Sequence, residues 1–337
     1  MRHAPEFWGR EPGLAAGLLA PFGAAWDAAG RVRRALVQPH RAPAPVICVG
    51  NLVAGGAGKT PVALALAEWL AARAIPVHVV ARGYGGRNAG PVRVDPAAHD
   101  AREVGDEALL LAARAPSWVA RNRAAGIAAA AAAGAAAVLL DDGFQNPSVA
   151  KALSLLVVDA GYGFGNRRVI PAGPLREDLR RGLARADAVV LLGAGGSARA
   201  ATELGGRAVV PAVLAPVDGE RFAGRRVVAF AGIGRPQKFF AMLRGLGAEL
   251  VGEAPFPDHH RYRDRDIAAL RGAADRERAR LVTTAKDVVR LSAADRSGID
   301  VLAVEIRWLD PAALAGLLAP IVLSAGGDGR PPDRDPC

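Results

Sequence analysis

Short runs of aliphatic and β-branched residues alternate with alanine-rich stretches along the first two thirds of the chain. VICVG, PVHVVA, SWVA, AAAVLLDD and LSLLVVDA each have the length of a strand. Between them, helices are expected at about 59–72 and from residues 106 and 122 onward, the last through the alanine-rich run AAGIAAAAAAGAAA. Strands that alternate with helices predict an α/β fold, a parallel sheet flanked by helices.

The pattern loosens after about residue 193 and then resumes. Residues 206–224 predict an extended linker with turns, and a second strand–helix series follows it, with strands RRVVAFAGIG, ARLVTTAKD and IDVLAVEIRW. We therefore expect a second, smaller α/β domain. The domains predicted from this pattern are an N-terminal segment at 1–43, a first domain at 44–205, the linker at 206–224, a smaller domain at 225–322 and a disordered tail at 323–337.

The N-terminal segment has its own periodicity. Apolar side chains recur every four residues and three arginines follow them: Leu14, Leu18, Phe22 and Trp26, then Arg31, Arg33 and Arg34. This layout is typical of a helix that lies in a membrane interface, with aromatic groups inserted and arginines near anionic head groups. A helix packed on the protein's own core is the alternative, and Pro21 would kink the helix in either case.

Composition limits the choices further. The chain has 337 residues, 51% of them hydrophobic, and carries a net charge of +10 with a pI near 10.6. Such a charge suggests an anionic partner, which could be nucleic acid, an acidic lipid surface or a phosphorylated substrate. The two cysteines form neither a disulfide framework nor a metal-ligand pattern. Lysine occurs only at positions 59, 151, 238 and 286, so each lysine is a candidate for a special site.

Targeting signals are absent from the sequence. MRHAPEFWGREPG has no basic start that leads into an apolar core and a cleavage site, and no stretch reaches 18 uncharged apolar residues. We therefore expect the protein on the cytoplasmic side.

A glycine-rich loop joins the first strand to the first helix. In VICVGNLVAGGAGKTPVALALAEWL the strict pattern G-x-x-x-x-G-K-[ST] is broken, because Val53 stands where the first glycine is expected. The core G-G-x-G-K-T is intact, and its N–H groups, its lysine and the helix N-terminus suit the phosphates of ATP. A chance glycine turn is the alternative. The predicted ATP-binding residues are Val53, Ala54, Gly55, Gly56, Ala57, Gly58, Lys59 and Thr60.

Candidate magnesium ligands follow the strand AAAVLL. Asp141 and Asp142 come at its carboxyl end, where phosphate-loop folds place an acid that holds Mg²⁺ directly or through water. The hydroxyl of Thr60 is a further ligand. Two aspartates at a strand end can also form an ordinary turn.

Several motifs together carry a resemblance. GNLVAGGAGKTP, ARGYGG, VGDEALLLA, DDGFQ, IPAGPLRE, FPDHHRY and TTAKD, in this order, resemble the tetraacyldisaccharide 4'-kinase family, the lipid A 4'-kinases of Gram-negative bacteria. The match spans roughly residues 5–310. It implies ATP- and Mg²⁺-dependent phosphorylation of the 4'-hydroxyl of an acylated disaccharide 1-phosphate at the inner membrane. It also accounts for Val53, because the loop of this family normally lacks the first glycine.

The resemblance implies roles for residues that the sequence alone leaves open. Taken alone, Asp106 and Glu107 read as an N-cap pair, and His259 as a loop histidine. The family pattern makes Asp106 the group that accepts or orients the proton of the attacking hydroxyl, paired with His259 across the domain cleft. Lys59 joins them as a catalytic residue.

Further residues are carried over from the same family. Arg176 is implied to face a phosphate, Glu177 to be a direct or supporting magnesium group, and Arg123 and Gln145 to contact substrate. Lys286 lies in a family-like context without an assigned role. Two departures affect local geometry: Asn146 stands where histidine is usual, and Ala108 stands where proline is common.

Two rival functions remain. A soluble phosphate-loop ATPase or small-metabolite kinase explains the loop, Asp141 and Asp142, but not the N-terminal periodicity or FPDHHRY. A nucleic-acid-binding protein explains the charge, although the arginines are spread over both domains and no nucleic-acid motif occurs, so we expect no nucleic acid partner. The expected partners are the acylated disaccharide phosphate and the anionic cytoplasmic face of the inner membrane, to which a peripheral, monotopic protein would bind. The oligomeric state is open, with a monomer favoured.

Overall fold

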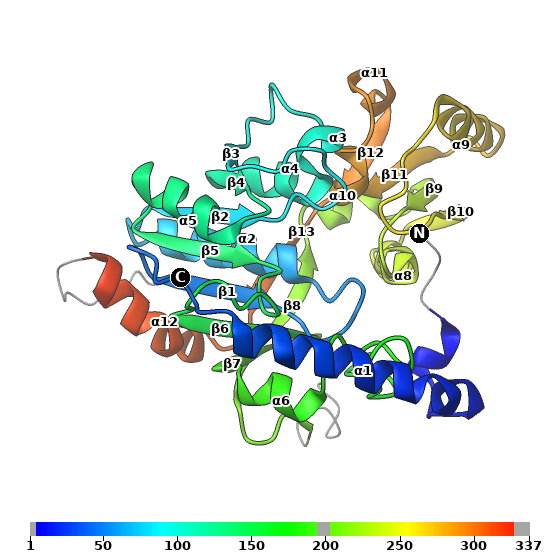
Figure 1. Ribbon diagram of the computed structural model, residues 1–337. Helices are drawn as coiled ribbons and strands as arrows, with labels where there is room; N and C mark the ends of the chain where they lie inside the picture. The colour runs from blue at the N-terminus through cyan, green and yellow to red at the C-terminus, as the bar shows by residue number, and fades with distance from the viewer. Residues whose placement is uncertain (1–4, 194–202, 327–337) are drawn as a thin grey trace.

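A computed structural model describes residues 5–193 and 203–326 of the protein (Figure 1). Its largest element is a nine-stranded sheet with the order β13-β8-β7-β6-β1-β5-β2-β4-β3. All neighbours pair in parallel except the outer pairs β13 with β8 and β3 with β4. Its strands are β1 (Val46–Gly50), β2 (Val77–Ala81), β3 (Val92–Arg93), β4 (Ser117–Val119), β5 (Ala137–Asp141), β6 (Leu153–Asp159), β7 (Ala188–Leu192), β8 (Ala208–Pro216) and β13 (Val304–Trp308).

Helices cover both faces of this sheet, as the alternation of strands and helices predicted. The central strands are buried along their whole length, so successive side chains supply two cores. On one face Ile47 and Val49 pack with α2 (Lys59–Ala71), α4 (Asp106–Ala112) and α12 (Pro311–Gly326). On the other face Val46 and Cys48 pack with α5 (Arg123–Ala132) and α6 (Leu179–Ala184).

A second, smaller sheet has four parallel strands in the order β10-β9-β11-β12. The strands are β9 (Arg226–Ala231), β10 (Glu249–Pro255), β11 (Arg280–Thr284) and β12 (Ile299–Leu302). One core lies around Phe239 and Phe240 of α8 (Pro236–Gly245), and the other lies around Ile267 and Leu270 of α9 (Asp264–Arg276). The short helices α10 (Ala285–Val288) and α11 (Ala293–Arg296) follow β11. A second α/β domain is therefore present.

The structure corrects the expected boundaries of the two domains. The expected linker at 206–224 contains β8, which belongs to the large sheet, and the 3₁₀ turn η2 (Gly219–Phe222). The run IDVLAVEIRW is two strands and not one, because the chain leaves the small sheet after β12 and β13 pairs with β8. Ile306 and the apolar face of α12 complete the core of the large sheet, so residues 304–322 do not belong to the smaller domain.

The expected tail at 323–337 also changes. Residues 323–326 are the end of α12, and residues 327–337 lie outside the described part of the chain.

The N-terminal elements are η1 (Glu6–Gly9) and α1 (Leu14–Leu36), and α3 (Ala101–Val104) precedes α4. Figure 1 shows α1 lying along one side of the large domain as a single long helix that includes Pro21. Within residues 5–193 and 203–326, no helix combines the length and the apolar character needed to cross a membrane.

Candidate active site

The glycine-rich loop connects β1 to α2, as the sequence predicted. Gly55 and Gly58 have φ angles of 113° and 86°, which glycine adopts without strain, and Gly58 is the N-cap of α2. Lys59 therefore begins the helix with its side chain over the loop. Its Nζ atom lies 3.2 Å from Asn51 Oδ1 and 3.6 Å from Asp142 Oδ1. The lysine is thus held between the end of β1 and the end of β5.

Val53 has a structural reason to replace glycine. Its side chain is buried among Leu52, Phe144 and Leu175, and its backbone forms a bridge with Leu175. The next residue extends this contact, because the N–H of Ala54 donates to Pro174 O at 2.7 Å. The first part of the loop is therefore fixed by core packing and strand pairing, and only its second part has glycines with positive φ angles.

Asp141 ends β5 beside this loop. It is 3% exposed, and one carboxylate oxygen accepts a hydrogen bond from Thr60 Oγ1 at 3.4 Å. Among the described residues, its other oxygen, Oδ1, is buried without a hydrogen-bond partner. Burial, with the charge of Glu107 as the next cause, raises the pKa of Asp141 to about 7. An uncompensated carboxylate beside a threonine hydroxyl fits the binding of a small divalent cation.

Magnesium fits these donors better than a metal that needs many protein ligands. Among the described residues, no three His, Cys, Asp or Glu side chains are arranged to enclose an ion. Mg²⁺ commonly uses one or two carboxylates and completes its shell with water and phosphate oxygens. Thr60 and Asp141 supply such a partial set.

The carboxylate of Asp142 is paired with cationic side chains of the protein. Arg176 Nη1 donates to its Oδ1 at 2.8 Å, and Lys59 lies near the same oxygen. Burial alone would raise the pKa of Asp142, but the charges of Lys59 and Arg176 outweigh it and lower the pKa. Asp142 therefore stays ionised and orients the two cations at the mouth of the loop.

The other expected substrate and magnesium residues form a supporting layer. Gln145 Nε2 donates to Asn51 O at 3.0 Å and to Glu177 Oε1 at 3.1 Å. Glu177 is 2% exposed and forms ion pairs with Arg185 and, at 3.4 Å, with Arg34 of α1. Two guanidinium groups thus satisfy this carboxylate, which favours a supporting role over direct metal binding.

Arg123 and Asn146 are likewise engaged by the protein itself. Arg123 is 4% exposed at the start of α5 and donates to Ala120 O. Asn146 Oδ1 accepts from the N–H of Ser148 at 2.8 Å, which closes the turn after DDGFQ. Asn146 therefore has a local structural role at the position where the family usually has histidine.

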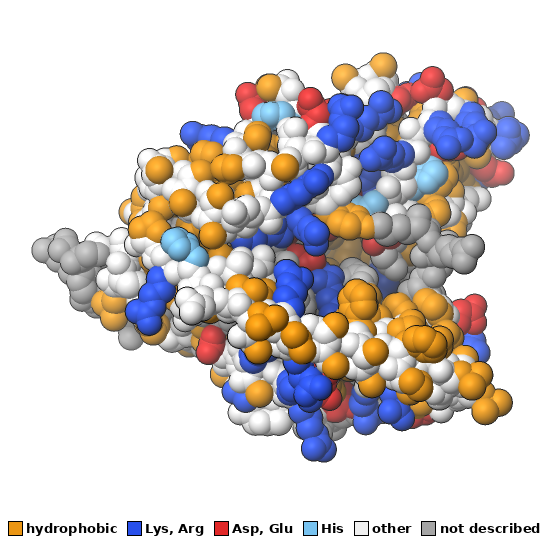
Figure 2. All heavy atoms as spheres, in the orientation of Figure 1, with side chains coloured by type: hydrophobic (Ala, Val, Ile, Leu, Met, Phe, Trp, Pro, Cys, Tyr) orange, Lys and Arg blue, Asp and Glu red, His pale blue; other side chains and the backbone are white. Residues whose placement is uncertain are grey.

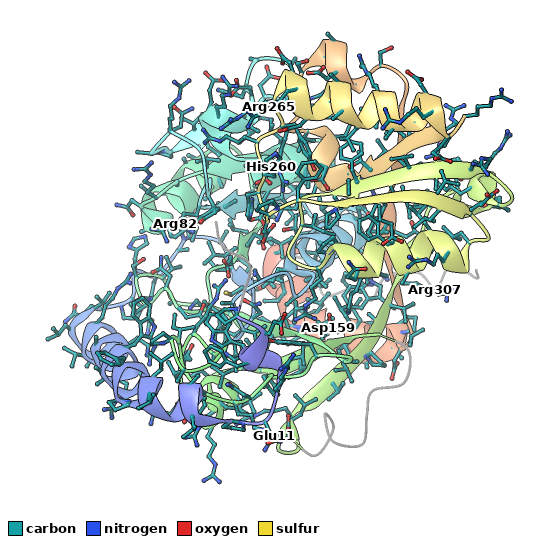
Figure 3. The ribbon with its side chains drawn as sticks, turned by 90° about the vertical axis from the view of Figure 1, so that its right-hand side faces the viewer. Glu11, Arg82, Asp159, His260, Arg265 and Arg307 are labelled. Carbon is teal, nitrogen blue, oxygen red and sulfur yellow. The ribbon has the colours of Figure 1, made fainter. Side chains whose placement is uncertain are left out.

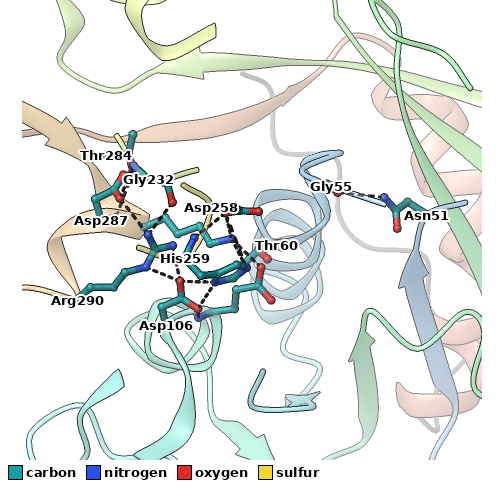
Figure 4. Close-up of polar contacts among 12 residues, drawn as sticks. Asn51, Gly55, Thr60, Asp106, Gly232, Asp258, His259, Thr284, Asp287 and Arg290 are labelled. Carbon is teal, nitrogen blue, oxygen red and sulfur yellow. Dashed lines mark hydrogen bonds and ion pairs between the residues drawn. The ribbon is translucent and has the colours of Figure 1, made fainter. Parts of the chain in front are cut away.

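The second half of the site joins the two domains (Figure 4). Asp106 begins α4 in the large domain and is 4% exposed, and His259 lies in the loop after β10. His259 Nδ1 lies 2.9 Å from Asp106 Oδ2 and 3.2 Å from Oδ1. The structure thus brings together two residues 153 positions apart. Gly105 permits this turn, since it has a φ of 87° and an added Cβ would lie 2.5 Å from Tyr84 O.

Cations surround this pair. Arg290 Nε donates to Asp106 Oδ2 at 2.6 Å. Lys286 Nζ donates to Glu107 Oε1 at 3.0 Å and lies 3.4 Å from His259 Nε2, which gives this lysine a location in the site. Burial alone would raise the pKa of Asp106, but the hydrogen bond from His259 and the charges of Lys286 and Arg290 hold it well below its usual range.

Sequence reasoning missed several residues of the site. Asn51, Asp258 and Asp287 were not singled out although they lie within quoted motifs, and neither was Arg290, which follows the motif TTAKD. For Arg290 a signal existed, because it follows Lys286 by four positions in KDVVR, and such residues share a side of a helical turn.

The smaller domain also touches the phosphate loop. A Cβ added to Gly234 would lie 2.8 Å from the backbone N of Gly56. Next to this contact, Arg235 and Lys238 of the smaller domain form ion pairs with Asp159 at the end of β6, and Figure 3 shows Asp159 on the side that faces α8. The two halves of the site are therefore fixed against each other by backbone packing and by charge.

The fold and the site together define a phosphate-loop nucleotide-binding protein with an additional α/β domain that completes the site. A family model described as "Tetraacyldisaccharide-1-P 4'-kinase" matches residues 15–322. The chain belongs to this family, as its motifs indicated.

Relatives support this assignment along the whole chain. A tetraacyldisaccharide 4'-kinase of Rhodospirillum centenum is 53% identical over 334 residues, which cover 97% of this chain and 99% of the relative. One of Rhodospirillum rubrum is 51% identical over 327 residues, covering 95% and 98%. A crystal structure of the "apo" form of LpxK from Aquifex aeolicus in complex with ATP is 26% identical, with a TM-score of 0.74, and covers 91% of this chain and 99% of that chain.

Proposed function

We propose that this protein is an ATP-dependent kinase that phosphorylates the 4'-hydroxyl of a tetraacyldisaccharide 1-phosphate in lipid A biosynthesis. The observation that carries the proposal is the pairing of Asp106 with His259 next to an intact phosphate loop. A loop with strand-end carboxylates is sufficient to bind ATP. A carboxylate–imidazole pair from a second domain adds what transfer to a hydroxyl needs, namely a positioned base.

The hydrogen bonds suggest how the two residues divide the work. Asp106 is held ionised, so it accepts from His259 Nδ1, and Nε2 of the neutral ring then carries the lone pair. His259 Nε2 takes the proton of the sugar hydroxyl as the new oxygen–phosphorus bond forms and the bond to the ADP oxygen breaks. Asp106 orients the ring and stabilises the imidazolium. The entering hydroxyl takes the place of Lys286 Nζ near Nε2.

The phosphate loop positions the other reactant. N–H groups around Gly55, Gly56 and Gly58 surround the phosphates, and Lys59 reaches the transferring group, where positioning and charge stabilisation dominate catalysis. Thr60 and Asp141 would hold a magnesium ion, and Asp142 keeps Lys59 and Arg176 in place. Bound Mg²⁺ would neutralise charge on the phosphate oxygens.

We place the enzyme at the cytoplasmic face of the inner membrane as a peripheral, monotopic protein. The four apolar residues of α1 that recur every fourth position point away from the core, with Leu14, Leu18, Phe22 and Trp26 exposed by 90%, 77%, 65% and 56%. The opposite face of α1 is buried, through Ala16, Gly23 and Asp27. In Figure 2 the exposed apolar face runs below a hollow that Lys and Arg side chains border.

A membrane location also follows from the substrate. Extraction of acyl chains into water costs about 0.8 kcal/mol per CH₂ group, so a kinase that works at the surface avoids a large penalty. The exposed face of α1 and the trailing arginines suit an anionic interface.

One assay tests the catalytic proposal. The purified protein is incubated with ATP, Mg²⁺ and the acylated disaccharide 1-phosphate, and the lipid product is followed by ³¹P NMR. We expect a second phosphate on the lipid. ATP hydrolysis without transfer to the lipid would instead favour the soluble ATPase, and salt-sensitive DNA binding without ATP turnover would favour the nucleic-acid-binding protein.

A second experiment tests the membrane proposal. Leu18, Phe22 and Trp26 are replaced together by serine, and flotation with anionic vesicles is measured with KM for the lipid and for ATP. Vesicle binding should fall and KM for the lipid should rise, while KM for ATP stays nearly unchanged. The matched control replaces Leu309 and Leu323, which are exposed by 50% and 57% elsewhere on the surface, and should behave like the parent. Parent-like vesicle binding of the triple variant would contradict the role of α1.

A further inference from the structure

Arg290 is a buried arginine of the smaller domain that reaches into the large domain. Its side chain is 5% exposed, and Nε donates to Asp106 Oδ2 at 2.6 Å. At the other end of the guanidinium, Nη1 donates to Gly232 O at 2.7 Å. Burial of a guanidinium is unfavourable unless it is paired and hydrogen-bonded, so this arrangement indicates a specific role.

A second buried carboxylate fixes the arginine. Asp287 is fully buried, and its Oδ1 accepts from Arg290 Nη1 at 3.0 Å, from Tyr262 Oη at 2.7 Å and from the N–H of Gly232 at 2.8 Å. Its other oxygen accepts from Thr284 Oγ1 at 2.6 Å. Asp287 therefore cannot turn without breaking several hydrogen bonds, and Arg290 is rigid because Asp287 is rigid.

Both members of the Asp106–His259 pair are linked to this arginine, Asp106 directly and His259 through a shared backbone carbonyl. Asp106 binds the guanidinium directly. The backbone N–H of His259 donates to Gly232 O at 3.0 Å, the same carbonyl that accepts from Arg290. His259 itself has a φ of 58°, an unfavourable conformation for a residue with a side chain, so its loop needs such support.

We propose that Arg290 is a positioning residue for proton transfer, which holds Asp106 as an ionised acceptor and so fixes His259 with Nε2 directed at the acceptor hydroxyl. This inference rests on the kinase function proposed above. With Oδ2 occupied by Arg290, Asp106 cannot rotate away from the imidazole, and His259 Nδ1 must remain a donor.

The expected effect on pH dependence follows from the charges that face His259. These are Asp106 on α4, Lys286 on α10, Asp258 in its own loop at 3.8 Å and, behind Lys286, Glu107. Removal of the Arg290 cation leaves the Asp106 charge unshared. The imidazole then binds its proton more tightly, and the low-pH side of the rate profile moves to higher pH.

The experiment compares Arg290→Met and Arg290→Lys with a control at another arginine of the smaller domain. Arg226 forms surface ion pairs with Glu249 and Glu277, so Arg226→Met removes an arginine of the same domain far from the pair. Arg290→Met should lower kcat by about 10²-fold through misplacement of the base, with KM for ATP nearly unchanged. The low-pH side of its kcat profile should move up by roughly 0.5 to 1 pH unit.

The conservative variant and a double variant complete the test. Arg290→Lys keeps the charge but loses the planar fork, so it should shift the profile less and recover part of kcat. In an Asp106→Asn background, Arg290→Met should add little further loss, because the residue acts through Asp106. An unmoved pH profile, or a full multiplicative loss in the double variant, would overturn the proposal.

Two measurements separate this proposal from its premise. Thermal melting and ATP binding of Arg290→Met report whether the protein is folded with an intact phosphate loop. The His259 ring titration, followed by NMR in the free protein with His259→Ala for assignment, should move to higher pH in Arg290→Met even without turnover. A wild-type protein without transfer to the lipid would refute the kinase function, whereas an active wild type with an unmoved ring titration in the variant would refute only the role of Arg290.

Discussion

Asp106 and Asp141 are buried to nearly the same extent, at 4% and 3% exposure, but their surroundings move their pKa values in opposite directions. Asp106 accepts hydrogen bonds from His259, Arg290 and the N–H of Glu107. Asp141 accepts one, from the Thr60 hydroxyl, and has Asp142 as a charged neighbour. The pKa of Asp106 lies well below its usual range, and that of Asp141 is raised to about 7.

The difference shows which of the two carboxylates has its charge neutralised by the protein's own groups. Asp106 of the large domain is neutralised by side chains of the smaller domain, so its role requires no bound ion. Asp141 has an unpaired buried oxygen, an arrangement that is unfavourable until a cation arrives. We therefore interpret Asp106 as part of a preorganised proton-transfer unit and Asp141 as half of an ion site that the substrate complex completes.

The strongest test of this contrast concerns the ion and phosphate site. Asp141→Asn and Lys59→Ala should each lower turnover by about 10³- to 10⁵-fold, because phosphoryl transfer depends on positioning and charge stabilisation. Steady-state transfer to the lipid measures the loss. Asp300→Asn, which removes a carboxylate from a surface pair with Arg280, is the matched control and should stay near the wild type. Rates near those of the control in either variant would remove the loop from the mechanism.

A second test concerns the proton-transfer unit. Asp106→Ala and His259→Ala should lower kcat by about 10²- to 10⁴-fold, with ATP affinity from calorimetry little changed. Residues that act as one unit give non-additive losses, so the double variant should be only slightly worse than the worse single variant. Independent, multiplicative losses would mean that Asp106 and His259 act separately.

The candidate phosphate loop was easier to recognise from the sequence than the contacts among Asp106, His259 and Arg290, for a physical reason. The loop, Lys59 and Thr60 lie on one strand–turn–helix unit, and Asp141 comes at the end of the adjacent strand β5. Periodicity and short motifs encode such local arrangements. Asp106 and Arg290 are 184 positions apart and meet only because two domains pack together. Asp106 and His259 could be paired only through the family resemblance.

The errors in the predicted domain boundaries have a related cause. β8 and β13 form one of the two outer antiparallel pairs of the large sheet, and β13 comes directly after the last strand of the small sheet. The hydrophobic pattern of IDVLAVEIRW is the same whichever sheet receives it, so the switch at Ala303 leaves no local signal. The tertiary structure shows that the chain returns to the large sheet, for example through the pairing of Ile306 with Leu214.

A third prediction compares stability in the absence of nucleotide and magnesium. Asp106→Asn removes one of the two carboxylates that pair with the buried guanidinium of Arg290 and should lower the free energy of unfolding by about 3 to 5 kcal/mol. Asp141→Asn removes an incompletely paired carboxylate and should raise it by about 1 to 3 kcal/mol. Urea unfolding at neutral pH measures both. A decrease in both variants would mean that Asp141 is already satisfied by the protein.

The smallest effect, and the sharpest distinction, is the pH dependence of these two stability differences. Asp106 has a depressed pKa in the folded state, so its contribution is fully present above the unfolded pKa of about 4 and is lost as pH falls further. The penalty of Asp106→Asn should therefore stay constant between pH 7 and pH 5. Asp141 has a raised pKa of about 7, so the favourable contribution of its protonated form is lost as pH rises toward 7.

The advantage of Asp141→Asn should accordingly shrink as pH falls from about 7 toward about 4, whereas the penalty of Asp106→Asn should not change between pH 7 and pH 5. Urea unfolding of the wild type and both variants at several pH values in this window gives the two differences directly. Added Mg²⁺ with ATP should remove the advantage of Asp141→Asn, since only the wild-type carboxylate gains an ion there. If both stability differences change together with pH, the two carboxylates do not differ in how they are neutralised. The conclusion that the protein itself neutralises Asp106, whereas Asp141 needs a bound cation, would then be wrong.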